Sequence, residues 1–327
     1  MLNSRQGPAS EAIISRLLAT EDREKIIYRM AGDKCILVEV GDEKIDFRQR
    51  IYIYLLKHMI FKMQISGVQE ITPGVRSLLI TYDNLIVSAV DLVEILKVLD
   101  QTINNKENVK IPSRLFELPI VFNDRWTKEA IERYRNTIRA EAPYLPDNTA
   151  FIARCNGLSG SDEVIEKVLS TEYIVLAQGD GYLGTPLSVA LDPRCRLICP
   201  KYNPARTYTK EGTIAIGGSF LGYYAADVPG GYQLIGRSIP SFDKTQVNDA
   251  YKEYPWLFRS FDRFKFTSVT EEEFIEIREN LSDYTIKITD GVFAIEEYEQ
   301  FEASIKAETE AFNRQQQEAL ITATVGL

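Results

Sequence analysis

The 327-residue chain has 45% apolar and 26% charged residues, a composition typical of soluble globular proteins that excludes wholesale disorder. Its formal net charge of −9 argues against nucleic acid or an anionic membrane as the main partner, because both would repel it. At roughly 100–200 residues per domain, the length predicts two domains with additions at the ends.

Residues 1–24 are interpreted as an N-terminal extension. Its charged residues, among them Arg5, Glu11 and Arg16, interrupt any apolar run that could serve as a signal peptide. No other stretch approaches the ~18 apolar residues that span a bilayer. We therefore expect a cytoplasmic protein.

Residues 25–110 predict a small α+β domain. Short β-rich runs at 26–30, 36–40 and 76–82 alternate with helical patterns at 46–63 and 88–104. Thr72-Pro73-Gly74 is the expected turn before the third strand. The polar run 104–108 is the expected linker to the next domain.

Residues 111–243 contain many short strands separated by glycine and proline, which indicates a closed or nearly closed β-barrel. The pattern alone does not say which barrel. Two helices are expected within this region, one near 126–142 and a shorter one capped by Ser161.

Residues 244–327 are interpreted as an α/β tail. Thr270 and Glu273 have the spacing of a capping box before a helix, and residues 284–288 resemble a strand. Residues 295–323 predict one long polar helix with a narrow apolar stripe. Such a stripe favours packing on the protein's own body, with docking to a partner as the alternative.

Histidine and cysteine are too scarce for several kinds of chemistry. His58 is the single histidine and lies in a helical pattern, so paired-histidine metal sites and Ser-His or Cys-His nucleophiles are disfavoured. The four cysteines are expected to be reduced thiols. Cys195 and Cys199 have no second ligand pair to complete a zinc site, and no metal is expected.

Three clusters combine glycine or proline with polar side chains and are the candidate sites. They are residues 178–186, which include Asp180 between two glycines, residues 201–206, which carry two cations, and residues 217–237. Glycines let the backbone approach a small ligand closely, and cations bind carboxylate or carbonyl oxygens. A Gly-Asp-Gly segment is also common in ordinary tight turns, and no Gly-Lys-Ser/Thr follows to support a phosphate loop.

Six segments, in order along residues 28–312, resemble one family. The segment 229–237 resembles the hallmark of the allophanate hydrolase subunit 1 family, and the others resemble its urea carboxylase branch. The segments are Tyr28 to Gly41, Thr72 to Leu78, Gly179-Asp180-Gly181-Tyr182-Leu183-Gly184, Leu191-Asp192-Pro193-Arg194, Lys201-Tyr202-Asn203-Pro204-Ala205-Arg206 and Pro229-Gly230-Gly231-Tyr232-Gln233-Leu234-Ile235-Gly236-Arg237.

This resemblance implies an α+β fold, with a small α+β domain followed by a cyclophilin-like β-barrel and a helical C-terminal extension. It implies half of a carboxyltransferase, which moves a carboxyl group from carboxybiotin to urea or a similar small amide or guanidine. The implied partners are a subunit 2-type half, a biotin carboxylase and a biotin carrier that supplies carboxybiotin in trans. The branch usually has a histidine where this chain has Cys195, and the 327 residues contain neither a Met-Lys-Met biotin site nor an ATP-grasp region.

The resemblance and the residue chemistry together suggest roles for eight residues. Asp180 suits hydrogen bonds from the acceptor's amino group, and Asn203 suits its carbonyl, while Lys201, Arg206 or Arg237 would stabilise developing negative charge. Tyr182, Tyr232 and Gln233 are expected wall residues. Asp180, Asn203 and Arg206 are the catalytic candidates, and the substrate-binding candidates are Tyr182, Lys201, Tyr232, Gln233 and Arg237.

Two other functions remain open from the sequence. The same fold occurs in components of ATP-dependent 5-oxoprolinases, which shorter members of the family resemble. The family also includes an inhibitor of a histidine kinase, so a non-catalytic binding protein is the third possibility.

Overall fold

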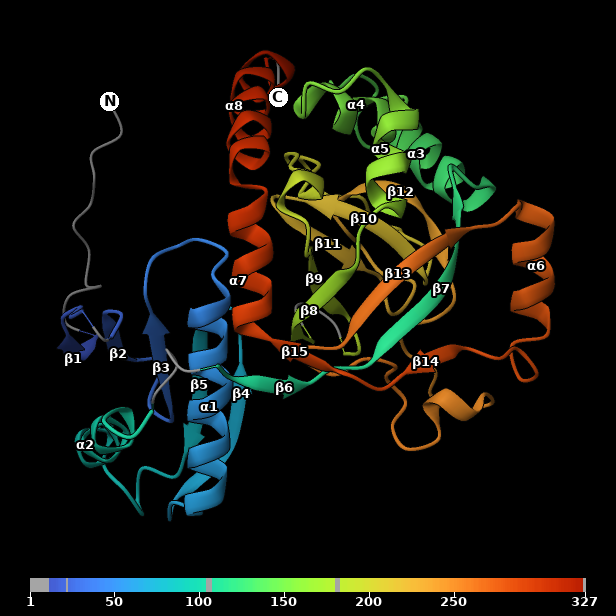
Figure 1. The fold of residues 1–327 in the computed structure, drawn as a ribbon. Helices are drawn as coiled ribbons and strands as arrows, with labels where there is room; N and C mark the ends of the chain where they lie inside the picture. Colours follow the sequence, from blue (N-terminus) through green and yellow to red (C-terminus); the bar gives the residue numbers. More distant parts are fainter. Residues whose placement is uncertain (1–11, 22, 104–107, 180–182, 326–327) are drawn as a thin grey trace. The chain divides into compact units, whose positions relative to one another are not determined.

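The computed structural model describes residues 12–21, 23–103, 108–179 and 183–325 (Figure 1). It divides into two compact units, residues 1–110 with 294–296 (unit 1) and residues 111–293 with 297–327 (unit 2). Unit 1 is a small α+β sheet domain, and unit 2 is a β-barrel with helices that include the C-terminal ones. The predicted fold class is confirmed.

The described part of unit 1 is an antiparallel five-stranded sheet with two helices. Alternate side chains of the inner strands, such as Ile36, Val38 and Val40, are fully buried, as expected for a sheet covered on one face. The strands, in sheet order, are β1 (Ile13–Leu17), β2 (Ile26–Met30), β3 (Cys35–Val40), β5 (Ser77–Tyr82) and β4 (Val68–Pro73). Strands β1 and β4 were not predicted, and Thr72 and Pro73, which were expected in a turn, are the last residues of β4.

Helices α1 (Phe47–Met63) and α2 (Ala89–Asp100) cover the buried face and share its apolar core. Each begins at a side-chain cap, because Asp46 accepts hydrogen bonds from the backbone N–H groups of residues 48 and 49 and Ser88 accepts one from that of residue 91. Both predicted helices are confirmed, although α2 ends at Asp100 rather than near residue 104.

Eight strands of unit 2 form the barrel sheet. Their order is β12 (Gln233–Ser238), β10 (Thr213–Gly217), β11 (Phe220–Tyr223), β9 (Pro186–Ala190), β8 (Tyr173–Gln178), β13 (Arg263–Ser268), β7 (Leu115–Phe122) and β14 (Lys287–Thr289). Strand β12 also pairs with β7, and this closes the ring, leaving β14 outside it. The strand predicted at 284–288 begins later than expected, because β14 covers only Lys287–Thr289.

One long strand, β7, makes this closure possible. Its second half pairs with β12 at residues 120–122, while its first half pairs with β14 at residues 115–117 on the same edge. A Cβ atom on Gly236 would lie 2.3 Å from the carbonyl oxygen of Val121, so the closing strand needs glycine there. The short strands β6 (Lys110–Pro112) and β15 (Val292–Ala294) pair separately.

The two faces of the barrel wall differ in what covers them. Ile214 pairs with Tyr223 and Ile216 with Leu221, and these four side chains belong to the main apolar core. The intervening pair, Ala215 and Gly222, therefore faces the opposite side of the wall. That second face carries the candidate site.

Helices α3, α4 and α5 of unit 2 each differ from the prediction. Helix α3 (Arg125–Thr137) stops before residue 142, and α4 (Asn148–Cys155) was not predicted. Helix α5 (Ser161–Leu169) has Gly160, not Ser161, at its N-cap position and no side-chain cap. Ser161 is already the first helical residue, so its hydroxyl is one position too late to cap the helix.

Helix α6 (Glu271–Glu279) begins as predicted. The Thr270 hydroxyl accepts from the backbone N–H of Glu273, and the Glu273 carboxylate accepts from that of Thr270, which completes the capping box. Short 3-10 turns lie at Pro193–Cys195 and Asp249–Tyr251.

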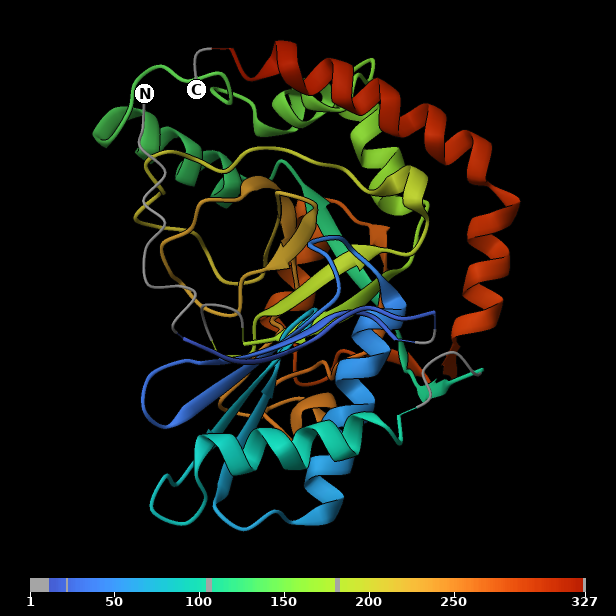
Figure 2. The same cartoon turned by 90° about the vertical axis from the view of Figure 1, so that its left-hand side faces the viewer.

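The predicted single C-terminal helix is two helices, α7 (Ile295–Ser304) and α8 (Lys306–Ala323), which meet at an angle (Figure 2). Ile305 interrupts the helix with φ −115° and ψ 17°. Helix α8 packs on α4, burying Phe312, and its Gln316 Nε2 donates to Asn156 Oδ1 at 2.7 Å. The apolar stripe thus packs on its own unit.

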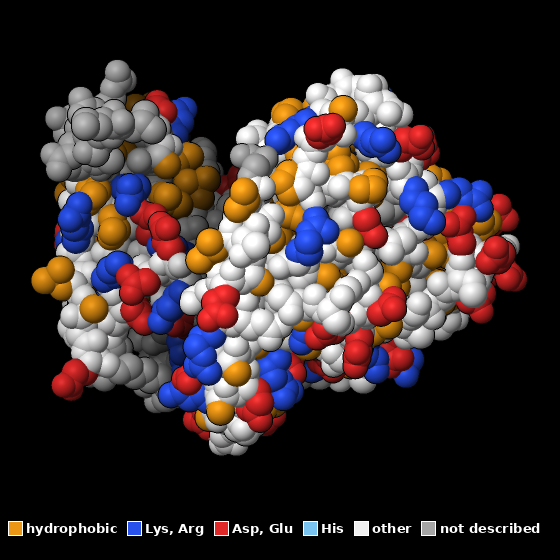
Figure 3. Space-filling view, turned by 90° about the horizontal axis from the view of Figure 1, so that it is seen from above, with side chains coloured by type: hydrophobic (Ala, Val, Ile, Leu, Met, Phe, Trp, Pro, Cys, Tyr) orange, Lys and Arg blue, Asp and Glu red, His pale blue; other side chains and the backbone are white. Residues whose placement is uncertain are grey.

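The described surface shown in Figure 3 mixes lysine and arginine with aspartate and glutamate side chains, without an extended area of one sign. None of the described helices is both long and apolar enough to span a membrane.

Candidate functional site

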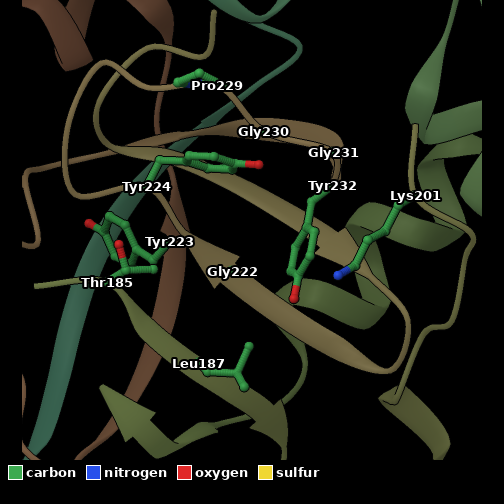
Figure 4. Close-up of a pocket in the computed structure, with 10 residues that line it drawn as sticks. All are labelled: Thr185, Leu187, Lys201, Gly222, Tyr223, Tyr224, Pro229, Gly230, Gly231 and Tyr232. Carbon is green, nitrogen blue, oxygen red and sulfur yellow. The ribbon is translucent and has the colours of Figure 1, made fainter. Parts of the chain in front are cut away.

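A cavity of about 230 Å³ lies on the outer face of the barrel wall in unit 2 (Figure 4). It is smaller than the ~300–1,000 Å³ clefts that take drug-sized ligands, so it suits a small molecule. Strands β9 and β11 form its floor, and the segments 201–206 and 224–232 form its walls. Its lining residues are Thr185, Leu187, Lys201, Gly222, Tyr223, Tyr224, Pro229, Gly230, Gly231 and Tyr232.

Two glycines of the barrel wall make room for the ring of Tyr232. A Cβ atom on Gly217 would lie 2.4 Å from this ring, and one on Gly222 would lie 2.9 Å from it. Real Cβ atoms do not approach other atoms so closely, so both positions exclude side chains while the ring stays in place. Tyr232 therefore rests directly on the backbone of β10 and β11.

The two wall segments are joined by backbone hydrogen bonds. The Arg206 N–H donates to Gly230 O at 2.9 Å, the Gly230 N–H donates to Arg206 O at 3.0 Å, and the Tyr202 N–H donates to Gly231 O at 2.6 Å. Lys201 extends from this ladder, and its Nζ lies 5.0 Å from the centre of the Tyr232 ring (Figure 4).

Arg206 lies beneath the wall and is only 1% exposed. Its Nη1 donates to Tyr232 O at 2.6 Å, and its Nε and Nη2 donate to Thr209 Oγ1 at 3.3 and 3.2 Å. Its Nη2 also lies 3.4 Å from the hydroxyl of Tyr224, and its guanidinium stacks on Tyr202. These partners are all neutral.

Among the described lining residues of the cavity, Lys201 is the charged one, and none is a carboxylate. Burial raises the pKa of Tyr223 far above its ordinary value and that of Tyr202, beneath Arg206, to about 12, so both phenols stay neutral at physiological pH. The arrangement can therefore bind an anionic or carbonyl oxygen.

The structure brings some predicted site residues together. Lys201 and Tyr232 line the cavity, and Arg206 supports it. Asp180 and Tyr182 lie outside the described residues, but the segment that contains them is bounded by Gly179 and by the cavity residue Thr185, whose carbonyl accepts from the Gly179 N–H at 2.8 Å.

The other predicted site residues do not line this cavity. Asn203 is exposed, and its backbone carbonyl oxygen accepts a hydrogen bond from Arg139 Nη1 at 2.9 Å. Gln233 is fully buried on the core side, opposite Ile216, and its Nε2 donates to Pro200 O at 2.8 Å. Arg237 contacts Trp126 and Glu211 elsewhere on the barrel.

Sequence reasoning did not single out Tyr224, Leu187 and Thr185 as lining residues. Tyr224 directly follows strand β11 and resembles an ordinary apolar core position. Gly230 carries the usable signal, because a Cβ atom there would lie 2.1 Å from the Tyr224 hydroxyl. Gly230 thus makes room for the side chain of Tyr224.

Two other residues considered from the sequence lie away from the cavity lining. His58 Nδ1 lies 2.7 Å from Tyr54 O on α1. Cys195 is buried and its sulfur lies 3.5 Å from the Ser170 hydroxyl, and burial raises the pKa of its thiol. Within the described ranges, no group of three or more His, Cys, Asp or Glu side chains could hold a metal ion.

Residues 26–251 match the carboxyltransferase domain family, in the part described as subdomains C and D. The chain is 42% identical over 276 residues to urea amidolyase of Saccharomyces cerevisiae, which covers 84% of this chain but only 15% of that protein. The crystal structure of Kluyveromyces lactis urea carboxylase is similar with a TM-score of 0.88 at 35% identity, covering 96% of this chain and 28% of that one.

A more distant relative is matched over nearly its whole length. A 5-oxoprolinase subunit of Bacillus subtilis is 26% identical over 254 residues, which cover 76% of this chain and 95% of that protein.

Proposed function

The chain belongs to the carboxyltransferase domain family, and from this premise we propose that it is one half of the carboxyltransferase of a biotin-dependent urea carboxylase. The observation that carries the proposal is the 42% identity to a urea amidolyase over 84% of the chain. The reaction would transfer a carboxyl group to a nitrogen of urea or of a similar small amide or guanidine.

Carboxybiotin, brought by a separate carrier, would supply the carboxyl group. The residues present fit such a group, because Lys201 Nζ and the Tyr224 hydroxyl offer hydrogen-bond donors at a cavity lined by no described carboxylate. The small volume would hold the reacting groups close together and exclude much of the water.

We assign complementary roles to the chain's own residues. Asp180 would accept hydrogen bonds from the acceptor's amino group and orient the attacking nitrogen. Lys201 would stabilise negative charge on the transferred group, with Tyr182 and Tyr232 as walls. Asn203, at the exposed end of the wall segment, would contact the acceptor's carbonyl, while Arg206, Gln233 and Arg237 would hold the surrounding backbone.

We further propose that the chain acts with a homologous subunit 2-type half, a biotin carboxylase and a biotin carrier. The purified chain is expected to be inactive alone, because its match to the Saccharomyces cerevisiae urea amidolyase spans only 15% of that protein.

Reconstitution tests this proposal. The chain would be mixed with the subunit 2-type half, a biotin carboxylase and a biotinylated carrier, and ATP- and bicarbonate-dependent carboxylation of urea would be followed with labelled bicarbonate. Activity should require every component, and omission of the carrier is the matched control. Carboxylation by the isolated chain, or none with all components present, would contradict the proposal.

A component of a 5-oxoprolinase is the second candidate. It is supported by the similarity to the Bacillus subtilis 5-oxoprolinase subunit, of which the chain matches 95%. In the same reconstitution, ATP-dependent opening of 5-oxoproline, without carboxylation of urea, would favour this function.

A further inference from the structure

We propose that the cavity of unit 2 is a carboxylate-binding subsite, in which Tyr224 and Lys201 donate hydrogen bonds to the carboxylate and Arg206 stabilises its charge from beneath. The inference rests on the proposed function and deepens it, because it assigns the described donors of this cavity to the transferred carboxyl group rather than to the amino groups of the acceptor. It also gives a role to Tyr224, which lies within the candidate cluster 217–237 but had no role assigned from the sequence.

The buried charge of Arg206 is the first argument. A guanidinium that is 1% exposed loses most of its hydration, and such charges are normally paired with a carboxylate. Here the partners among the described residues are a carbonyl, two hydroxyls and the Tyr202 ring. These groups satisfy its N–H donors but leave its positive charge without a counter-charge, so an anion bound nearby is stabilised.

Tyr224 connects this charge to the cavity. Its phenol oxygen lies 3.4 Å from Arg206 Nη2, which donates toward it, and Tyr224 also lines the cavity. A hydroxyl oxygen that accepts a hydrogen bond from a cation becomes a stronger donor through its own hydrogen. The Tyr224 hydroxyl occupies the space that a side chain at position 230 would fill (Figure 4). Its O–H is therefore a polarised donor toward a ligand in the cavity.

Lys201 and Thr185 complete the donor set. Lys201 is exposed, no carboxylate among the described residues pairs with it, and its Nζ can leave the Tyr232 ring for a ligand at little cost. Thr185 lines the cavity, and its buried Oγ1 has no hydrogen-bond partner among the described groups. The Tyr224 and Lys201 donors, with no carboxylate among the described lining residues, select a carboxylate over a neutral amide, whose N–H groups would face other donors.

Binding of a small carboxylate to the whole chain tests the inference without any carboxyl transfer. The probe is sodium acetate, and acetamide is its neutral control of the same shape. Both would be titrated at constant ionic strength, with the backbone amide signals of Gly222, Gly230 and Gly231 followed by NMR. Acetate should saturate these shifts at a dissociation constant at least about tenfold below that of acetamide, as one charge-assisted hydrogen bond would produce.

The variants separate the donors from the scaffold. Y224F and K201M should each weaken acetate binding about tenfold and leave acetamide binding within about twofold. R206K keeps the charge but loses the forked contacts, so it should weaken acetate binding less than Y224F does. The matched controls are Y254F and K252M, whose side chains lie outside the cavity lining and should have no effect.

Each outcome decides the point. Equal affinity for acetate and acetamide, or wild-type acetate affinity in both Y224F and K201M with thermal unfolding unchanged, overturns the inference. Selective acetate binding in a chain that never supports carboxylation of urea would leave the subsite standing and remove the proposed function. Carboxylation without acetate selectivity would do the reverse.

Discussion

Two buried arginines of unit 2 lie in contrasting surroundings. Arg206, beside the cavity, has only neutral partners among the described residues. Arg237, in the region where β12 meets α3 and α6, shares the Glu211 carboxylate with Arg278; its Nη2 donates to Glu211 Oε1 at 2.7 Å. Its guanidinium also lies over the rings of Trp126 and Phe274, at 4.6 and 5.6 Å.

The contrast shows that the effect of burying an arginine depends on whether a carboxylate is buried beside it. Burial lowers the pKa of Arg237, and the neighbouring Glu211 charge opposes this change, so the pair forms a closed structural contact. Arg206 has no such counter-charge among the described groups, and its charge acts on whatever enters the cavity. We expect the Arg237 region to govern stability and the Arg206 region to govern binding.

The largest effect is expected for E211Q. The substitution removes the carboxylate that Arg237 and Arg278 share, leaving two like charges in a partly buried contact that the remaining charge of Asp124 offsets only in part. The free energy of unfolding should fall by about 3–5 kcal/mol, measured by urea denaturation. Acetate binding by the molecules that stay folded should be unchanged, and a stability loss below about 1 kcal/mol would contradict the structural role.

D180N should have the next largest effect, and this effect should be on turnover rather than on stability. The amide replaces an acceptor-only group with one that also presents donors to the acceptor's amino groups. Turnover in the reconstituted complex should fall about ten- to a hundredfold, equivalent to roughly 1.5–3 kcal/mol. Thermal unfolding of the variant should match wild type. Turnover within about twofold of wild type would leave Asp180 as a turn residue and shift attention to residues 201–206.

R206M sharpens the comparison of the two arginines. Removing a buried cation without a counter-charge relieves its desolvation cost and offsets part of the lost hydrogen bonds, so stability should fall by only about 1 kcal/mol. Acetate binding should weaken at the same time. If R206M destabilises the chain as much as E211Q does in the same urea denaturation, the distinction between the two regions fails.

The smallest effect is expected for the ion pair between Arg125 of α3 and Glu271 of α6. Hydrogen bonding to Arg125 lowers the pKa of Glu271, so its contribution to stability is present above the unfolded-state pKa, near 4.3. That contribution is lost as pH falls through the lower folded-state pKa. E271Q should cost less than about 1 kcal/mol at pH 7 and nothing at pH values below both pKa values. A difference that persists at low pH would exclude the ion pair as its cause.

The sequence predicted elements whose signals are local. The pair Thr270 and Glu273 caps a helix where predicted, because a capping side chain acts on backbone groups only two or three residues away. The two helices expected to begin near residues 46 and 88 do begin there, after the caps Asp46 and Ser88. Strands β2, β3 and β5 of the small sheet also lie where the β-rich runs predicted them. The break at Ile305 was not visible, since nothing in the local pattern interrupts the helix there.

The candidate site could be predicted only in part. The segment 201–206 and the glycines of residues 229–231 stood out by composition, and Lys201 and Tyr232 do line the cavity. Thr185 and Tyr224 lay inside the candidate clusters 178–186 and 217–237 but were not assigned roles, because single threonines and tyrosines near strand ends are common in any barrel. Gln233 and Tyr232 are adjacent in sequence, yet successive strand residues point to opposite faces, which separates them.

By itself, the amino-acid sequence determined the α+β class, the main helix starts and the family resemblance, all of which depend on short-range patterns and ordered motifs. Only the tertiary structure decided which polar residues share a cavity and which buried arginine has a carboxylate partner. Those outcomes depend on strand register and barrel closure, which bring together segments far apart along the chain.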